Sequence, residues 1–252
     1  MQATLRVSIV FFLCLLALSG RTAEPDPSLP MLGALSRFMA DIQLSMYEPE
    51  NSEFADSANS SWAALQQQYP VWLQALSEAD HRAAQAVWDE LLATVEGDEH
   101  YDGLLDIGFD TTLNANLRFQ MESLRTLLLK QPSMAAENLT PLQALWARHY
   151  RTLAGYMQVA TTPLGGMSLG AEDLDMSPPH MVQETDKVWD EALAAATLAQ
   201  KSTLTRARHR WEFVRETVLS ATQRSLPYAV NTQITSILRD VEWLISEQQG
   251  DQ

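Results

Sequence analysis

Apolar residues recur at spacings of three and four along almost the whole chain after residue 28, and polar residues fill the positions between them. This spacing matches the turn of an α-helix and not the strict alternation of a half-buried strand. Glycine is scarce, and extended runs of β-branched residues are missing beyond the N-terminal segment. Ala, Leu, Gln, Glu and Arg dominate, and these are good helix formers. The pattern therefore predicts an all-α protein.

Interruptions of this pattern, most of them at proline or glycine, separate eight predicted helices joined by mostly short connections. The predicted ranges are 29–47, 60–76, 80–95, 104–130, 140–160, 182–200, 203–222 and 227–248. The expected N-caps are Ser60 or Ser61 for the second helix, Asp80 for the third and Thr140 for the fifth.

Motifs of the first half return in the same order in the second half. The matching positions are Leu32 and Leu142, Trp62 and Trp189, Trp88 and Trp211, and Leu117 and Leu238. This order favours duplication of one helical segment, although two unrelated sets of amphipathic helices also share such periodicity. The predicted fold is two tandem antiparallel four-helix bundles, at 24–132 and 138–249, with one elongated helical bundle as the alternative. The paired tryptophans are expected to anchor the cores.

The N-terminal segment has the three parts of a secretory signal peptide. One basic residue, Arg6, precedes the apolar run Val7–Leu18, and small residues stand before a cleavage point after Ser19. The apolar run is shorter than the roughly 17–25 residues of a transmembrane helix, and an uncleaved anchor is the alternative. We therefore predict a signal peptide at 1–19, a periplasmic or secreted protein, and no membrane attachment after cleavage.

The net charge, the cysteine content and the motifs of the chain reduce the number of function classes to consider. The single cysteine, Cys14, lies in the signal segment, so the mature protein enters an oxidising compartment without disulfides. A net charge of −15 repels nucleic acid and anionic membranes. The chain contains no Gly-x-Ser-x-Gly elbow, glycine-rich phosphate loop or Cys/His pair. We expect a non-enzymatic binding or accessory protein that acts through a small ligand or a protein partner. The plan is similar to that of the extracytoplasmic parts of some bacterial sensors, at the level of fold alone.

A few residues are candidates for such binding. Arg118 and Arg239 flank apolar stripes, where an arginine either lies along the core edge or holds a small anion. Arg206 and Arg210 stand one helical turn apart in a basic stretch. They form either a solvated face that pairs with acids of a neighbouring helix or a docking patch for an acidic partner. His149 lies on an apolar stripe and is expected to be buried and neutral with one hydrogen-bond partner; haem ligation is disfavoured because no C-x-x-C-H occurs.

The alternative function, copper handling, depends on a methionine-containing loop. Met167, Met176, His180 and Met181 lie in or beside a long connection with several prolines and glycines. Thioether and imidazole ligands suit copper(I), so these residues predict a periplasmic copper-handling protein as the alternative. The competing interpretation is a loop whose methionines make ordinary core contacts. No other cofactor is predicted.

Overall fold

The computed structural model describes residues 26–97, 103–107, 110–161, 177–221 and 225–250. Within these residues the regular structure is helical and no strand is found, so the all-α prediction is confirmed. The eight long helices are α2 (Ser28–Tyr47), α3 (Ser52–Ala75), α4 (Glu78–Glu96), α6 (Thr111–Leu129), α7 (Pro141–Thr161), α8 (Pro178–Ala195), α9 (Leu198–Leu219) and α10 (Pro227–Gly250). The short elements are α5 (Leu104–Ile107) and the 3-10 turns η1 (Pro132–Met134) and η2 (Ala136–Asn138).

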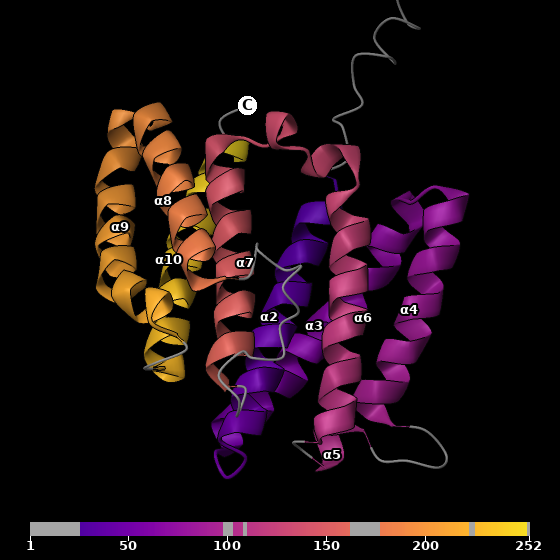
Figure 1. Ribbon diagram of the computed structural model, residues 1–252. Helices are drawn as coiled ribbons and strands as arrows, with labels where there is room; N and C mark the ends of the chain where they lie inside the picture. Colours follow the sequence, from indigo (N-terminus) through magenta and orange to yellow (C-terminus); the bar gives the residue numbers. More distant parts are fainter. Residues whose placement is uncertain (1–25, 98–102, 108–109, 162–176, 222–224, 251–252) are drawn as a thin grey trace, which may run out of the picture.

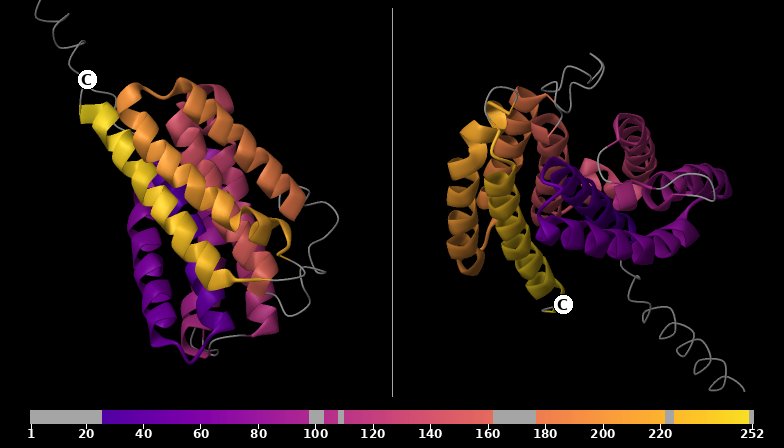
Figure 2. Two further views of the ribbon diagram at one scale, coloured as in Figure 1. Left: turned by 90° about the vertical axis from the view of Figure 1, so that its left-hand side faces the viewer. Right: turned by 90° about the horizontal axis from the view of Figure 1, so that it is seen from below.

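The helices form two groups that meet along α2 and α7 (Figures 1 and 2). α3, α4 and α6 lie on one side of this pair, and α8, α9 and α10 lie on the other. α2 packs extensively against both α3 and α7. The buried apolar side chains form two clusters: one comes from α2 to α6, and the other comes from α7 to α10 with a few additions, among them Leu32 and Ala40 of α2. We call these two groups the N-terminal half and the C-terminal half.

A glycine allows α2 and α7 to approach each other. A Cβ atom added to Gly33 would lie 2.4 Å from the Cη2 atom of Trp146, which is too close for any other residue without a shift. A polar contact between the halves lies nearby, where Arg37 of α2 donates from Nη1 to the hydroxyl of Thr235 in α10 at 2.6 Å. The same guanidinium donates from Nε to Asp41 at 2.8 Å. Burial raises the pKa of Asp41, and Arg37 opposes that rise.

The N-terminal half contains a layer of aromatic side chains between α3 and α4. Trp88 of α4 lies parallel to Tyr69 of α3, with ring centroids 3.9 Å apart, and also stacks on Trp62 at 5.5 Å. Phe38 of α2 meets Trp62 at 4.8 Å. Because these rings stand between the helices, the backbones of α3 and α4 approach each other at few points.

The C-terminal half is closed more tightly. α8 lies alongside α9, and α10 packs against both α7 and α9. His149 of α7 meets the rings of Trp189 and Trp211 in edge-on geometry, at 5.4 and 5.5 Å between centroids. All three side chains are fully buried.

Several helix boundaries differ from the prediction because of capping. The second helix begins well before Ser60, since the side chain of Asn51 caps it. The third is capped by Ser77, whose side chain accepts a hydrogen bond from the backbone N–H of Asp80. Thr140 lies at the predicted start of the fifth helix, and its hydroxyl accepts from the backbone N–H three residues later at 3.3 Å. Side-chain acceptors at such positions satisfy N–H groups that the first helical turn leaves unpaired.

The predicted helix 104–130 is two helices. α5 ends at Ile107, and α6 begins at Thr111. The side chain of Asp110 accepts hydrogen bonds from the backbone N–H groups of Thr112 and Leu113, both at 2.8 Å. This double cap starts a new helix at a point where the apolar spacing alone predicts a continuous one.

The predicted signal peptide at 1–19 lies outside the described residues. Among the helices that are described, none combines the length and the apolar character needed to cross a bilayer.

Candidate functional site

An open cleft lies between α2, α6 and α7, where the two halves meet. Its volume is about 390 Å³, counted with the open space at its mouth. α2 and α6 come from the N-terminal half and α7 from the C-terminal half, so neither half forms the cleft alone. We call it the seam cleft.

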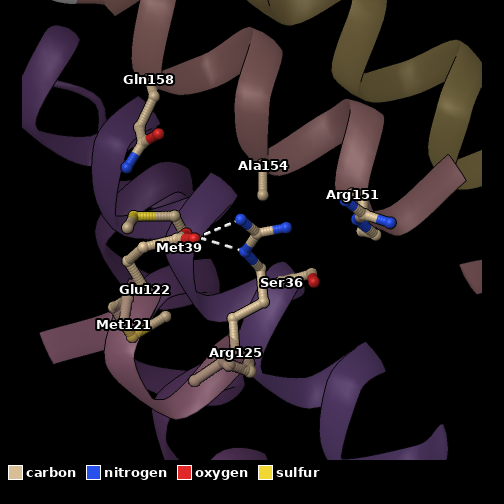
Figure 3. Close-up of a pocket in the computed structure, with 9 residues that line it drawn as sticks. Ser36, Met39, Met121, Glu122, Arg125, Arg151, Ala154 and Gln158 are labelled. Atoms are coloured by element: carbon tan, nitrogen blue, oxygen red, sulfur yellow. Dashed lines mark hydrogen bonds and ion pairs between the residues drawn. The ribbon is translucent and has the colours of Figure 1, made fainter. Parts of the chain in front are cut away.

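Two arginines and one glutamate supply the charge of the seam cleft. Arg125 Nε donates to the Oε2 atom of Glu122, one turn earlier on α6, at 2.7 Å, and a second contact between the same groups completes a fork. Figure 3 shows the Arg125 guanidinium in the middle of the cleft, below Ala154 of α7. Arg151 adds a second guanidinium from α7. The cleft therefore carries a net positive charge in a protein whose overall net charge is −15.

The remaining lining is mostly apolar. Met39 of α2 and Met121 of α6 contribute thioether side chains, and Leu35 adds an aliphatic one. Ser36 and Gln158 provide neutral polar groups, and both residues are largely buried, at 4% and 7% exposed. A charged end beside apolar walls suits a small ligand that is itself charged at one end and apolar at the other.

A buried polar network connects the same three helices. Gln43 of α2 donates from its amide nitrogen to Asn114 Oδ1 of α6 at 2.7 Å. Thr161 of α7 donates its hydroxyl to Gln43 Oε1 at 3.1 Å. Buried hydrogen bonds of this kind fix the relative positions of the elements that carry them. The network therefore sets the spacing of the helices that form the seam cleft.

The arginines predicted from the sequence lie elsewhere. Arg118 is half-buried on α6 and Arg239 is exposed on α10, and neither lines the seam cleft. Arg206 and Arg210 of α9 both pair with Asp240 of α10, the former at 3.4 Å. This geometry matches the interpretation as a helix face paired with a neighbouring helix, while docking of an acidic partner stays a prediction.

His149 is fully buried in the core of the C-terminal half, away from the seam cleft. Burial lowers its pKa to about 3, and the positive charges of Arg148 and Arg208 add to that shift, so the ring is neutral at pH 7. The expected single hydrogen-bond partner is missing, because neither ring nitrogen is paired with any described residue. The ring instead packs against Trp189 and Trp211 at steep interplanar angles of 71° and 76°.

The residues of the copper hypothesis are only partly placed. Met167 and Met176 lie outside the described residues. Met181 is 1% exposed and belongs to the core of the C-terminal half. His180 lies in the first turn of α8, where its backbone carbonyl accepts from Arg148 Nη2 at 3.3 Å. Within the described part of the chain, no group of three or more His, Cys, Asp or Glu is placed to hold a metal ion.

Sequence reasoning did not find Arg125 and Arg151. Arg125 stands beside the apolar stripe of its helix, the same signal that selected Arg118, whereas Arg151 lies on the side of its helix opposite to the stripe of Leu142 and Leu153. Which of these arginines faces a neighbouring helix depends on how the two halves pack, and helical periodicity does not contain that information. No protein-family model, curated protein or solved structure matches this chain.

Proposed function

We propose that this chain is an exported, non-enzymatic binding protein that holds a small organic anion in the seam cleft. The observation that carries the proposal is that Arg125 and Arg151, from different halves, line the same cleft together with apolar side chains. A guanidinium binds a carboxylate through strong charge-assisted hydrogen bonds. The enclosed part of the cleft is small, about 40 Å³, so it admits a carboxylate-sized group while a short tail lies along the open apolar mouth. A monocarboxylate with a short apolar tail matches both features.

We infer further that the two halves descend from one duplicated helical segment. The matched tryptophans support this: Trp62 meets Phe38 of the first helix in its half, and Trp189 meets His149 of the first helix in the other. The separate core cluster of each half is a second support. On this proposal α2 and α7 are equivalent helices, and the seam cleft lies at their junction.

Ligand binding at such a junction is suited to a sensor-like or accessory role. A carboxylate held by both arginines would connect α6 of the N-terminal half to α7 of the C-terminal half. Binding would thus fix the spacing of the halves, and a protein partner that touches both would respond to it. The predicted signal peptide supports a periplasmic or secreted location, and we expect cleavage after Ser19.

The proposal is tested with the chain from Gly20 onwards. Acetate, butyrate, hexanoate and benzoate are titrated by calorimetry and by thermal melting, with the neutral alcohol of each carbon skeleton as the control. We expect the carboxylates to raise the melting temperature, more so with longer tails, and the alcohols to have a much weaker effect. Binding to the native state alone stabilises it in proportion to ligand saturation.

Two arginine variants test whether the carboxylates bind in the seam cleft. Arg151→Met should weaken carboxylate binding by about 10- to 100-fold, as expected for loss of a hydrogen bond to a charged group worth about 1.5–3 kcal/mol. Arg82→Met makes the same change of charge at a side chain that is 75% exposed on α4, and it should leave binding unchanged. Equal losses in both variants, or no carboxylate binding in the parent chain, would show that the seam cleft is not an anion site.

A further inference from the structure

A second and larger groove lies at the other end of the junction between the halves. It is enclosed by the beginning of α2, the η1–η2 connection, α7 and the last turns of α10. Its volume is about 1300 Å³, counted with the open space at its mouth. We call it the end groove.

The walls of the end groove are mainly apolar. Leu29 comes from α2, Met134 and Leu139 come from the connection, and Ile245 comes from α10. The indole of Trp146 also lines the groove and is itself 7% exposed. The enclosed part of the groove, about 590 Å³, has room for an alkyl or aryl group of several carbon atoms.

All ionisable side chains that line the end groove are acidic. They are Asp26 and Glu242, and neither lysine nor arginine is among the described lining residues. Glu242 is held in place, because its Oε1 atom accepts from Trp146 Nε1 at 2.9 Å and from the Tyr150 hydroxyl at 3.3 Å. A carboxylate fixed beside an indole is a combination that attracts an organic cation, by charge and by the aromatic ring.

A serine in the wall adds an acceptor. Ser133 lines the end groove, and its buried Oγ atom has no hydrogen-bond partner among the described residues. A buried hydroxyl without a partner is costly, so a ligand that donates an N–H to it gains from that contact. This favours a cation that carries N–H groups over one that is fully alkylated.

We propose that the end groove binds a primary ammonium compound with an apolar tail. The ammonium group lies against Glu242, within reach of Ser133, and the tail covers Trp146 and Ile245. This site is separate from the seam cleft in position and opposite to it in charge. The proposal for the end groove does not depend on anion binding in the seam cleft.

The test uses alkylammonium ions from butyl to octyl, titrated by calorimetry, with the alcohol of each chain length as the neutral control. Burial of each added methylene should tighten alkylammonium binding by about three- to fourfold. The alcohols should bind at least tenfold more weakly at each length. Octyltrimethylammonium should bind more weakly than octylammonium if Ser133 accepts an N–H. An alcohol that binds as tightly as its ammonium counterpart would overturn the proposal.

Two matched variants of α10 distinguish binding in the end groove from nonspecific attraction of a cation to an acidic protein. Glu242→Gln keeps an oxygen that accepts from Trp146 and Tyr150 and removes the charge, so octylammonium binding should weaken about tenfold. Glu247→Gln removes the same charge from an exposed residue of the same helix that does not line the groove, and should change binding by less than twofold. Equal losses in the two variants would overturn the site.

If circular dichroism shows that Glu242→Gln perturbs folding, a variant of an apolar wall residue tests the site instead. Leu139→Ser changes a half-buried side chain in the connection before α7 and leaves the helices unaltered. It should weaken octylammonium binding more than butylammonium binding, because only the longer tail reaches the wall. An equal effect on both ligands contradicts the proposed orientation. Arg151→Met should leave ammonium binding unchanged, so failure of the anion proposal and failure of this one are distinguishable.

Discussion

The two halves follow the same order of four long helices but close differently. In the C-terminal half, α10 packs along α7 and shares its apolar core. In the N-terminal half, the corresponding last helix, α6, approaches α2 at fewer points and leaves the seam cleft. The stacked rings of Trp62, Tyr69 and Trp88 hold α3 and α4 apart, which widens that half. The loose packing of α6 on α2 therefore leaves room for the seam cleft beside α7.

Both cores bury polar atoms that have no hydrogen-bond partner among the described residues. In the C-terminal core both ring nitrogens of His149 and the Nε1 atom of Trp189 are buried without a hydrogen-bond partner among the described residues. In the N-terminal core the same holds for the Tyr69 hydroxyl and Trp72 Nε1. Among the histidines that the structure describes, however, the only buried one is His149 of the C-terminal half, a side chain that titrates near neutral pH in solution. The two halves should therefore respond differently to large truncations and to acid.

The largest effects are expected from truncating the matched tryptophans. Trp88→Ala and Trp211→Ala should each lower the free energy of unfolding by about 3–5 kcal/mol, the usual loss for a buried large aromatic side chain. The two variants should differ in the part of the structure that is destabilised. Trp88 is the spacer between α3 and α4, so its loss should release α4 locally. Trp211 lies in a closed core with α7 and α8, so its loss should weaken the whole C-terminal half.

Urea unfolding gives the size of these effects, and amide hydrogen exchange gives their location. Trp88→Ala should reduce protection mainly in α4, and Trp211→Ala should reduce it across α7 to α10. If both variants lose protection evenly over the whole chain, the two halves unfold as one unit and the contrast between them is wrong.

The second effect comes from acid acting on His149. Its pKa is about 3 in the folded protein, against an ordinary value near 6.5 in the unfolded chain. Between these values the unfolded chain binds the extra proton, so stability is lost as the pH falls below about 6.5. At about 1.4 kcal/mol for each pH unit, the loss between pH 6.5 and pH 5 is about 2 kcal/mol.

His149→Met isolates this contribution. Methionine is the residue that the sequence pairing places at the matching position of α2, Met39. The variant should be more stable than the parent by about 1–2 kcal/mol at pH 7, because it removes two buried polar atoms without partners. It should also lose the acid sensitivity between pH 6.5 and pH 5 in chemical denaturation. A parent and a variant with the same pH dependence would mean that His149 is paired or hydrated in the folded state.

The sequence predicts the helices far better than it predicts where they meet. Helix positions follow from apolar spacing, and the errors fall at caps such as Asn51 and Asp110, where a single side chain decides the boundary. The burial of His149 also follows from its place on an apolar stripe. The location of the seam cleft does not, because Arg125 and Arg151 come to line one cleft only when the two halves pack together. Arg118 carries the same local signal as Arg125 and lies outside the cleft.

The third prediction concerns the contact that holds the halves together. Gly33→Ala places a methyl group 2.4 Å from the rigid indole of Trp146, so α2 and α7 must move apart. The net loss of stability should be about 1–2 kcal/mol, since overpacking costs about 1–3 kcal/mol and alanine recovers up to about 1 kcal/mol of helix propensity.

Ala34→Gly is the control on the next residue of α2, where helix propensity falls and one partly buried methyl group at the edge of the N-terminal core is lost. It should cost about 1 kcal/mol and leave the binding sites intact. Gly33→Ala should in addition weaken ligand binding at both the seam cleft and the end groove, because both are built across this contact. Unchanged binding in Gly33→Ala would show that the sites do not depend on the docking of the halves.

The smallest effect is expected at the basic stretch of α9, which has no counterpart in the N-terminal half. Asp240 is shared by Arg206, whose side chain is 59% exposed, and by Arg210, which is 30% exposed. Exposed ion pairs contribute about 0–1 kcal/mol, so Arg206→Ala should change stability by less than about 0.5 kcal/mol and Arg210→Ala by slightly more. Raising the salt concentration should reduce both differences in thermal melting. A loss above about 2 kcal/mol from Arg206→Ala would mean that this pair, and not the apolar core, joins α9 to α10. If the loss is negligible, the stretch is free to vary without harm to the fold, and any requirement for Arg206 in a cell would then point to the acidic partner that the charge pattern predicts.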